Sequence, residues 1–329
     1  MKYSGIGGQA VIEGVMMKNL DSYAIAVRKP DGQIEVKKEN NGGLSSKSKI
    51  CKYPIIRGVV NFIDSLILGM STLTYSASFY EEEENDNRTP EQKKKSDAFF
   101  NAITILISVI LAIGIFVVGP LMLTQKLLVK YISSQSLLIL IEGVLRVVLF
   151  IGYVSLISMM KDIKRVYMYH GAEHKCINCI EHGLELNVEN VRKSSKEHKR
   201  CGTSFMLIVM CISILIIMFV RFDSMLLKMV ARILLIPVIA GVSYEVLRFA
   251  GTHDNKFTDI LSKPGLLLQG LTTREPDDDM IEVGIASVEA VFDWKKYLNE
   301  NFGYKYGDSD DTKAGIGERE ETAGTESDK

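Results

Sequence analysis

The sequence predicts a mainly α-helical, polytopic membrane protein with four transmembrane helices, a small β subdomain at the N-terminus and an amphipathic helix in the membrane interface. The chain has 329 residues, of which 47% are hydrophobic, and most apolar residues fall in long runs that are almost free of charge. The ends and one internal segment carry most of the charge, and this segregation is typical of membrane proteins. A net charge of -1 gives no reason to expect nucleic acid as a partner.

Four apolar runs approach the length that a helix needs to cross about 30 Å of hydrocarbon. The third run is short, and the fourth contains Lys228, Arg232 and Glu245. The runs are residues 102–123, 137–159, 204–220 and 225–247.

Basic residues predict the orientation, because Lys and Arg favour the cytoplasmic side of short connecting segments. The segment between the second and third runs carries nine Lys and Arg residues, whereas the first connection carries Lys126 and Lys130, and the last carries Arg221 with Lys228 just inside the fourth run. We therefore expect a multi-pass protein with this central segment and both termini in the cytoplasm. Residues 1–15 show no basic start leading into an apolar core, so we expect no removable signal peptide.

The pattern of polar and apolar residues divides the chain into seven segments. Residues 23–28 and 33–38 flank Pro30, Asp31 and Gly32, which predicts a strand, a turn and a second strand. The glycines Gly5, Gly7 and Gly8 lack the context of a phosphate loop and are interpreted as turn glycines. The segments are a cytoplasmic β subdomain (1–50), an interfacial helix and charged linker (51–98), the first two spans (99–160), a cytoplasmic loop rich in His, Cys and Glu (161–203), the last two spans (204–249), a cytoplasmic C-terminal segment containing a helix over 280–299 (250–307) and a disordered tail (308–329).

Residues 55–79 predict a helix that lies in the interface and does not span the membrane. Their apolar side chains recur at helical spacing, and polar side chains occupy other positions of the helical wheel. The apolar positions are Ile56, Val59, Val60, Ile63, Ile67 and Met70, and the polar positions are Arg57, Asn61, Asp64 and Ser65.

The strongest local signal for chemistry is the run His170, Gly171, Ala172, Glu173, His174. On a helix, positions i, i+3 and i+4 share one face, so the two imidazoles could bind one metal ion. The spacing H-x-x-E-H is that of the inverted zincins, in which the two His bind zinc and the Glu activates water. The alternative is two surface histidines beside an ordinary carboxylate, and Gly171 weakens the helix assumption.

A second cluster in the same segment strengthens the metal hypothesis. Zinc sites take three or four ligands from His, Cys and carboxylate side chains. His170 and His174 could therefore be completed by one or two of Glu181, His198 and Cys201, with Zn²⁺ or another divalent ion as the cofactor. The alternative is that such residues simply collect in a polar cytoplasmic segment.

Two further groups of residues are less specific. Cys176 and Cys179 form a C-x-x-C pair, but no second pair and no thioredoxin-like context accompany it, so two reduced thiols near the interface are expected. Glu142 and Arg146 lie one helical turn apart within the second span, where charges indicate either function or a structural ion pair. Arg232 in the fourth span is expected to snorkel towards the interface.

The chain resembles a known family through several separated motifs that occur in the same order. The motifs are residues 7–17 (GGQAVIEGVMM), residues 169–175 (YHGAEHK) and residues 200–205 (RCGTSF), followed by Thr272, Thr273, Arg274, Glu275 and Pro276. Together they are similar to the YqhQ-like family of bacterial membrane proteins, known as domain-of-unknown-function family 1385. The resemblance extends from about Gly5 to about Phe292 and implies a protein of the bacterial cell membrane.

The resemblance implies a metal-dependent enzyme but no substrate, because the family is described only as predicted metal-dependent enzymes. By motif position it supports the candidate ligands and the candidate base, and Arg200 lies beside them in the second cluster. It also draws attention to Gln9, Glu13 and residues 272–276, which could close over the metal-binding segment. Lys199 stands where the pattern leads us to expect Pro, and Cys176 and Cys179 are not part of it. The supported positions are His170, Glu173, His174, Glu181, His198 and Cys201.

Three functions compete at this point. The leading hypothesis is a zinc-dependent hydrolase at the cytoplasmic membrane face, with Glu173 as general base and an amphipathic or lipid-linked substrate. The second is a non-catalytic membrane scaffold with a structural metal, which a closed four-ligand site would favour. The third is transport through the spans, for which Glu142, Arg146 and Arg232 offer a thin pathway unless the protein forms a homo-oligomer.

Overall fold

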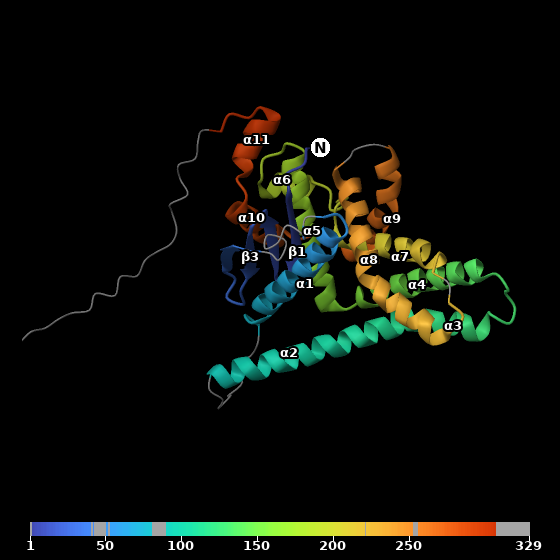
Figure 1. Ribbon diagram of the computed structural model, residues 1–329. Helices are drawn as coiled ribbons and strands as arrows, with labels where there is room; N and C mark the ends of the chain where they lie inside the picture. Colours follow the sequence, from blue (N-terminus) through green and yellow to red (C-terminus); the bar gives the residue numbers. More distant parts are fainter. Residues whose placement is uncertain are drawn as a thin grey trace, which may run out of the picture.

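The computed structural model describes residues 2–40, 42, 51, 53–80, 90–220, 222–252 and 256–306. The predicted tail (308–329) and part of the charged linker (81–89) lie outside these described residues. Within them the protein is mainly helical, with one four-stranded sheet at the N-terminus (Figure 1). The strands are β1 (Ile6–Val11), β2 (Gly14–Asn19), β3 (Ser22–Arg28) and β4 (Ile34–Asn40); the helices are α1 (Ile56–Ala77), α2 (Pro90–Ile113), the π-helical η3 (Gly114–Val118), α3 (Gly119–Leu127), α4 (Gln135–Ile157), α5 (Lys161–Glu181), α6 (Val188–Lys193), α7 (Gly202–Met218), α8 (Met225–Thr252), α9 (Lys256–Thr272), α10 (Asp278–Val291) and α11 (Trp294–Phe302).

The sheet is an antiparallel meander in the order β1-β2-β3-β4. The predicted hairpin is confirmed as β3 and β4, and Gly32 in its turn has the positive φ of 85° that glycine adopts at no steric cost. The turn interpretation of Gly7 and Gly8 is wrong, because both lie within β1. Gly8 faces α5, and a Cβ atom there would lie 2.9 Å from the Glu173 Cγ atom, so the missing side chain lets the strand and the helix approach closely.

The two faces of the sheet bury different partners because successive side chains of a strand point to opposite sides. Val15, Met17 and Ala26 pack in one apolar core with residues of α5, α6, α10 and α11. Met16 and Ile25 point to the other face, where Leu68 of α1 covers them. The sheet is therefore held between α1 on one side and α5 with α10 on the other (Figure 1).

Four helices of the described chain are long and apolar enough to cross a membrane. Three overlap the expected spans: Ala102–Leu127, Gln135–Ile157 and Met225–Ala250. The fourth is α1, while the expected third span forms the shorter helix α7 of 17 residues. Part of α1 packs on the sheet through Leu68, whereas Ile63, Leu66 and Ile67 on its other side are exposed. Its interfacial location stays a prediction.

The charged residues within the apolar helices form one paired group. The Glu142 carboxylate accepts hydrogen bonds from Arg146 Nη2 at 3.0 Å and from Arg232 Nη2 at 2.6 Å. Arg146 Nη1 also donates to Ser213 Oγ of α7 at 2.8 Å. The expectation that Arg232 snorkels is wrong, since the residue is 6% exposed and bound to Glu142.

Residues 161–203, expected as a loop, form largely helices α5 and α6. Helix α5 does not continue α4, because the chain turns at 158–160 before α5 begins. The single helix expected over 280–299 is two helices, α10 and α11, with Phe292 and Asp293 between them. Helix α10 packs on both α5 and the sheet, so α5 lies at the centre of this part of the protein (Figure 1).

Candidate metal centre

The H-x-x-E-H motif lies on α5, as the spacing argument assumed. Gly171 does not break the helix but creates a close contact. A Cβ atom at this position would lie 2.0 Å from the Arg274 carbonyl oxygen, so only glycine lets the segment after α9 lie against α5. The backbone N–H of Arg274 donates to the Tyr167 carbonyl at 2.9 Å and fixes this contact. The adjacent Thr272 carbonyl is thereby brought to His170.

Backbone carbonyls fix both imidazoles of the motif. His170 Nδ1 donates to the Thr272 carbonyl at 2.8 Å, and His174 Nδ1 donates to the Lys196 carbonyl at 2.6 Å. Because a carbonyl only accepts, each Nδ1 carries a proton, and in the neutral ring it is the Nε2 lone pair that can face a metal ion. This is the arrangement that orients metal-binding histidines in proteins.

Cys201 completes the cluster from the start of α7. Its sulfur lies 3.2 Å from His170 Nε2 and accepts the backbone N–H of Thr203 at 3.4 Å as the N-cap of the helix. One donor atom each from His170, His174 and Cys201 lie within 4.8 Å of one another. Nitrogen and sulfur are the donors that zinc prefers, and three protein ligands leave its fourth tetrahedral position open.

Glu173 is buried beside this cluster, with 5% of its surface exposed. Its Oε2 atom lies 3.9 Å from His170 Nε2. Burial raises the pKa of Glu173 to about 7, although the nearby His170 and the backbone N–H of Gly8 oppose this shift. The expected general base is therefore next to one candidate ligand and in contact with strand β1.

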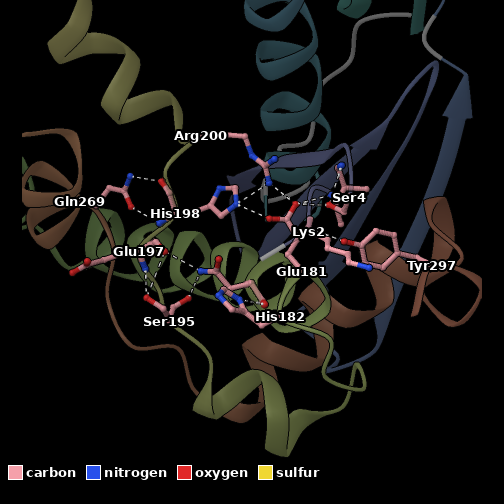
Figure 2. A network of polar contacts seen from close by, with 12 residues as sticks. Lys2, Ser4, Glu181, His182, Ser195, Glu197, His198, Arg200, Gln269 and Tyr297 are labelled. Atoms are coloured by element: carbon pink, nitrogen blue, oxygen red, sulfur yellow. Dashed lines mark hydrogen bonds and ion pairs between the residues drawn. The ribbon is translucent and has the colours of Figure 1, made fainter. Parts of the chain in front are cut away.

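The structure leaves Glu181 out of the group of donor atoms formed by His170, His174 and Cys201. Glu181 is fully buried, and its Oε1 atom accepts the Ser4 N–H at 2.9 Å, the Ser4 hydroxyl at 2.7 Å and an Arg200 Nη2 bond (Figure 2). Burial alone raises the pKa of Glu181, but His198 and Arg200 outweigh it and lower the pKa to about 2. Glu181 and Arg200 thus form an ion pair beside the cluster of described donor atoms.

His198 lies between this ion pair and the cluster. Its Nε2 atom is 3.6 Å from Glu181 Oε2, and its ring centroid is 5.7 Å from that of His174. Burial lowers the pKa of His198, and contact with Glu181 opposes this shift. The Gln269 side chain of α9 accepts the His198 N–H at 2.8 Å and donates to the His198 carbonyl at 2.7 Å (Figure 2). One amide side chain therefore holds both backbone groups of His198.

Two buried residues that the sequence did not single out hold the segment before His198. Lys175 Nζ donates to the carbonyls of Arg192 and Ser194 at 2.9 and 2.8 Å, and it pairs with Glu275 at 2.9 Å. Asn178 donates to the carbonyls of Ser195 and Glu197 at 2.7 and 2.9 Å. The signal that could have found them is their position on α5 directly after the motif, where polar side chains face a packed neighbour.

The cluster opens into a cavity of about 620 Å³. His170, Glu173, His174, His198 and Cys201 line it together with Gly8 and Gln9 of β1, so the structure brings Gln9 to the candidate site. Glu13 instead pairs with Arg165 and accepts the Tyr169 hydroxyl at 3.2 Å. Glu142 and Arg146 lie in α4, outside this cavity.

The C-x-x-C pair lies in the packed core. Cys176 and Cys179 are fully buried within the core that α5 shares with α10. Burial raises the pKa of Cys176 well above its usual value and that of Cys179 to about 11. Thiols in this state react poorly, so the pair is structural.

Comparison with known proteins supports the family and assigns no activity. The family model described as protein of unknown function (DUF1385) matches residues 53–294. The chain is 36% identical over 294 residues to the uncharacterized protein YqhQ of Bacillus subtilis (strain 168), an alignment that covers 85% of this chain and 90% of the relative. No solved structure matches the chain. The chain therefore belongs to the family of proteins of unknown function DUF1385.

Proposed function

We propose that this protein is an integral membrane hydrolase that depends on zinc or another divalent ion held by His170, His174 and Cys201. The observation that carries the proposal is the pair of Nδ1 bonds to the Thr272 and Lys196 carbonyls. These bonds direct both Nε2 atoms to the same place as the Cys201 sulfur, at the wall of a cavity large enough for a small substrate.

The residues around the cluster would have distinct roles. A zinc ion with three protein ligands lowers the pKa of coordinated water to about 7. Glu173 lines the cavity next to His170 and is positioned to accept and return a proton during hydrolysis. The clamps by Gln269 and Lys175 keep the His198 backbone and the Lys196 carbonyl in place, so the geometry of the ligands is set before substrate binds.

The apolar helices support a position at a membrane. Ser65 of α1 and Thr203 of α7 line the site cavity; α1 is long and apolar enough to cross a membrane, and α7 is a shorter apolar helix. The candidate site therefore lies where the polar part of the protein meets its apolar helices. An amphipathic or lipid-linked substrate, reached from the cytoplasmic face, fits this position and the excess of basic residues between 161 and 203.

A non-catalytic scaffold is the second candidate, and the position of His198 favours it. Its ring centroid lies 5.7 Å from that of His174, so a small movement would offer a fourth ligand. Four protein ligands would close the site and make the metal structural.

The first test is the metal content of the detergent-purified protein, measured by elemental analysis. We expect one equivalent of metal in the wild type and a loss of it in His170→Ala, His174→Ala and Cys201→Ala. The matched controls are His182→Ala and Cys211→Ala, which remove exposed residues of the same types and should keep the metal. A well-folded wild type without metal after loading with Zn²⁺ would refute the proposal. Retention of metal in His198→Ala with loss of hydrolysis in Glu173→Gln would favour the enzyme over the scaffold.

A further inference from the structure

We propose that the apolar helices hold one acyl chain of a membrane lipid, with the polar headgroup of that lipid at the candidate metal centre. This inference rests on the proposed function and names its substrate class. The substrate would be an acyl amphiphile from the leaflet on the side of the site. Hydrolysis would break the bond near its headgroup, with the hydroxyl of water going to one fragment and the proton to the other.

The chain would occupy an apolar cavity of about 440 Å³ among the helices. Helices α1, α2, α4, α7 and α8 and the π-helical segment η3 all contribute side chains to its wall. Phe116 and Val117 of η3 belong to this wall, and π-helical insertions occur frequently at functional sites. A lipid chain matches this apolar lining.

This cavity lies next to the site cavity along two helices. On α1, Ser65 lines the site cavity and Phe62, almost one turn away, lines the apolar cavity. On α7, Thr203 lines the site cavity and Phe205 lines the apolar cavity. The rings of Phe62 and Phe205 contact each other with centroids 5.5 Å apart, so an aromatic pair forms the end of the apolar cavity nearest the site cavity.

The length of the apolar cavity fits one leaflet. On α7 its wall runs from Phe205 to Ile217, which corresponds to about 18 Å of helix. Half of a hydrocarbon core of about 30 Å is about 15 Å, so the cavity accommodates the chain of a lipid from one leaflet. A protein segment would leave backbone groups without partners among these apolar side chains.

Polar groups that bind one another line the part of the cavity far from the site. Arg146, Ser213 and Arg232 line this end. Arg146 Nη1 donates to Ser213, and Arg146 Nη2 and Arg232 Nη2 donate to Glu142, so this end of the cavity is polar and unsuited to an acyl chain. The chain therefore ends at this group, while the headgroup remains at the other end beside Cys201 and Glu173.

The test is photolabelling in phosphatidylglycerol nanodiscs with a phosphatidylglycerol whose acyl chain carries a diazirine. Val209 lines the cavity, and Val209→Trp should fill it and reduce labelling of Met206 and Met210 several-fold. The matched control is Leu215→Trp, because Leu215 is 59% exposed on the outside of the same helix. We expect this control to keep the labelling, and both variants to keep the metal.

Unchanged labelling of Met206 and Met210 in Val209→Trp would overturn the inference, and so would labelling confined to outward residues such as Leu215. Ile236→Trp narrows the same cavity from α8 and repeats the test if Val209→Trp does not fold. Metal content is measured on the same samples. Labelling that persists in His174→Ala without metal supports the acyl site separately, so a failure of the metal proposal and a failure of the lipid inference give different results.

Discussion

His170 Nε2 lies 3.2 Å from the sulfur of Cys201, although 31 residues separate the two in the chain. The contact joins the middle of α5 to the first residue before α7. Neither residue holds this position alone, because the Thr272 carbonyl fixes the imidazole and the Thr203 N–H fixes the sulfur. The candidate centre therefore forms where three segments of the chain meet. Each contact that holds it in place can be removed by a separate substitution.

Lys175→Met should weaken metal binding without removing a ligand. Lys175 holds the Arg192 and Ser194 carbonyls, and this segment supplies the Lys196 carbonyl that fixes His174. Loss of such a support typically lowers metal affinity by about 10- to 100-fold. Competition with a zinc chelator measures the change. Lys193→Met is the control, because Lys193 is exposed on α6 and should leave the affinity unchanged; equal affinity in both variants would contradict the role of Lys175.

Gly171→Ala should destabilise the protein and reduce bound metal. The new Cβ atom would lie 2.0 Å from the Arg274 carbonyl oxygen, so the segment that carries Thr272 must move away from α5. Overpacking of this kind costs about 1 to 3 kcal/mol. Thermal unfolding in detergent measures it. Gly152→Ala on α4 meets no atom within 4 Å and should be neutral or stabilising, as alanine favours helix by about 1 kcal/mol.

Glu181→Gln should destabilise the protein at neutral pH, because it leaves the partly buried Arg200 without its carboxylate partner. Breaking a buried ion pair costs about 3 kcal/mol or more. Thermal unfolding at pH 7 measures the difference from wild type. Glu189→Gln is the control, since Glu189 and its partner Lys193 are both exposed and their pair contributes little.

The effect of Glu181→Gln should depend on pH. The folded pKa of about 2 lies below the unfolded value of about 4.3, so the carboxylate stabilises the folded state fully above about pH 4.3. This stabilisation is lost as the pH falls towards 2. The stability difference between wild type and Glu181→Gln should therefore shrink between about pH 4.3 and 2. A difference that stays constant or grows over this range would contradict the assignment.

Glu142→Leu should destabilise the apolar helices more than Arg232→Leu. The first change leaves Arg146 and Arg232 without their common partner, whereas the second leaves Glu142 paired with Arg146. An uncompensated buried charge costs about 3 to 5 kcal/mol. Thermal unfolding in detergent compares the two variants. Equal stability would show that the group does not act as a paired unit.

Local patterns in the sequence predicted part of this fold. Pro30, Asp31 and Gly32 indicated the hairpin of β3 and β4, and the spacing of His170 and His174 indicated a shared helix face. The identity of the fourth apolar helix was not predictable. Leu68 of α1 covers the sheet, and periodicity cannot distinguish a face that contacts a sheet from one that contacts lipid.

The supports of the candidate site were also hidden. The carbonyls of Thr272 and Lys196 fix the imidazoles. Sequence patterns do not reveal such contacts, because every residue has a backbone carbonyl. Glu181 shows the limit of spacing arguments. It follows His174 by seven residues on the same face of α5, but two turns correspond to about 10 Å along the helix, too far to share a ligand site.

The most direct test of the central claim is X-ray absorption spectroscopy of the zinc-loaded protein. The account predicts one sulfur at about 2.3 Å and two imidazole nitrogens at about 2.0 to 2.1 Å, with a light atom from solvent in the fourth position. In Cys201→Ser the sulfur contribution should disappear. A spectrum without sulfur in the wild type, or with a sulfur that remains in Cys201→Ser, would contradict a metal site built from His170, His174 and Cys201.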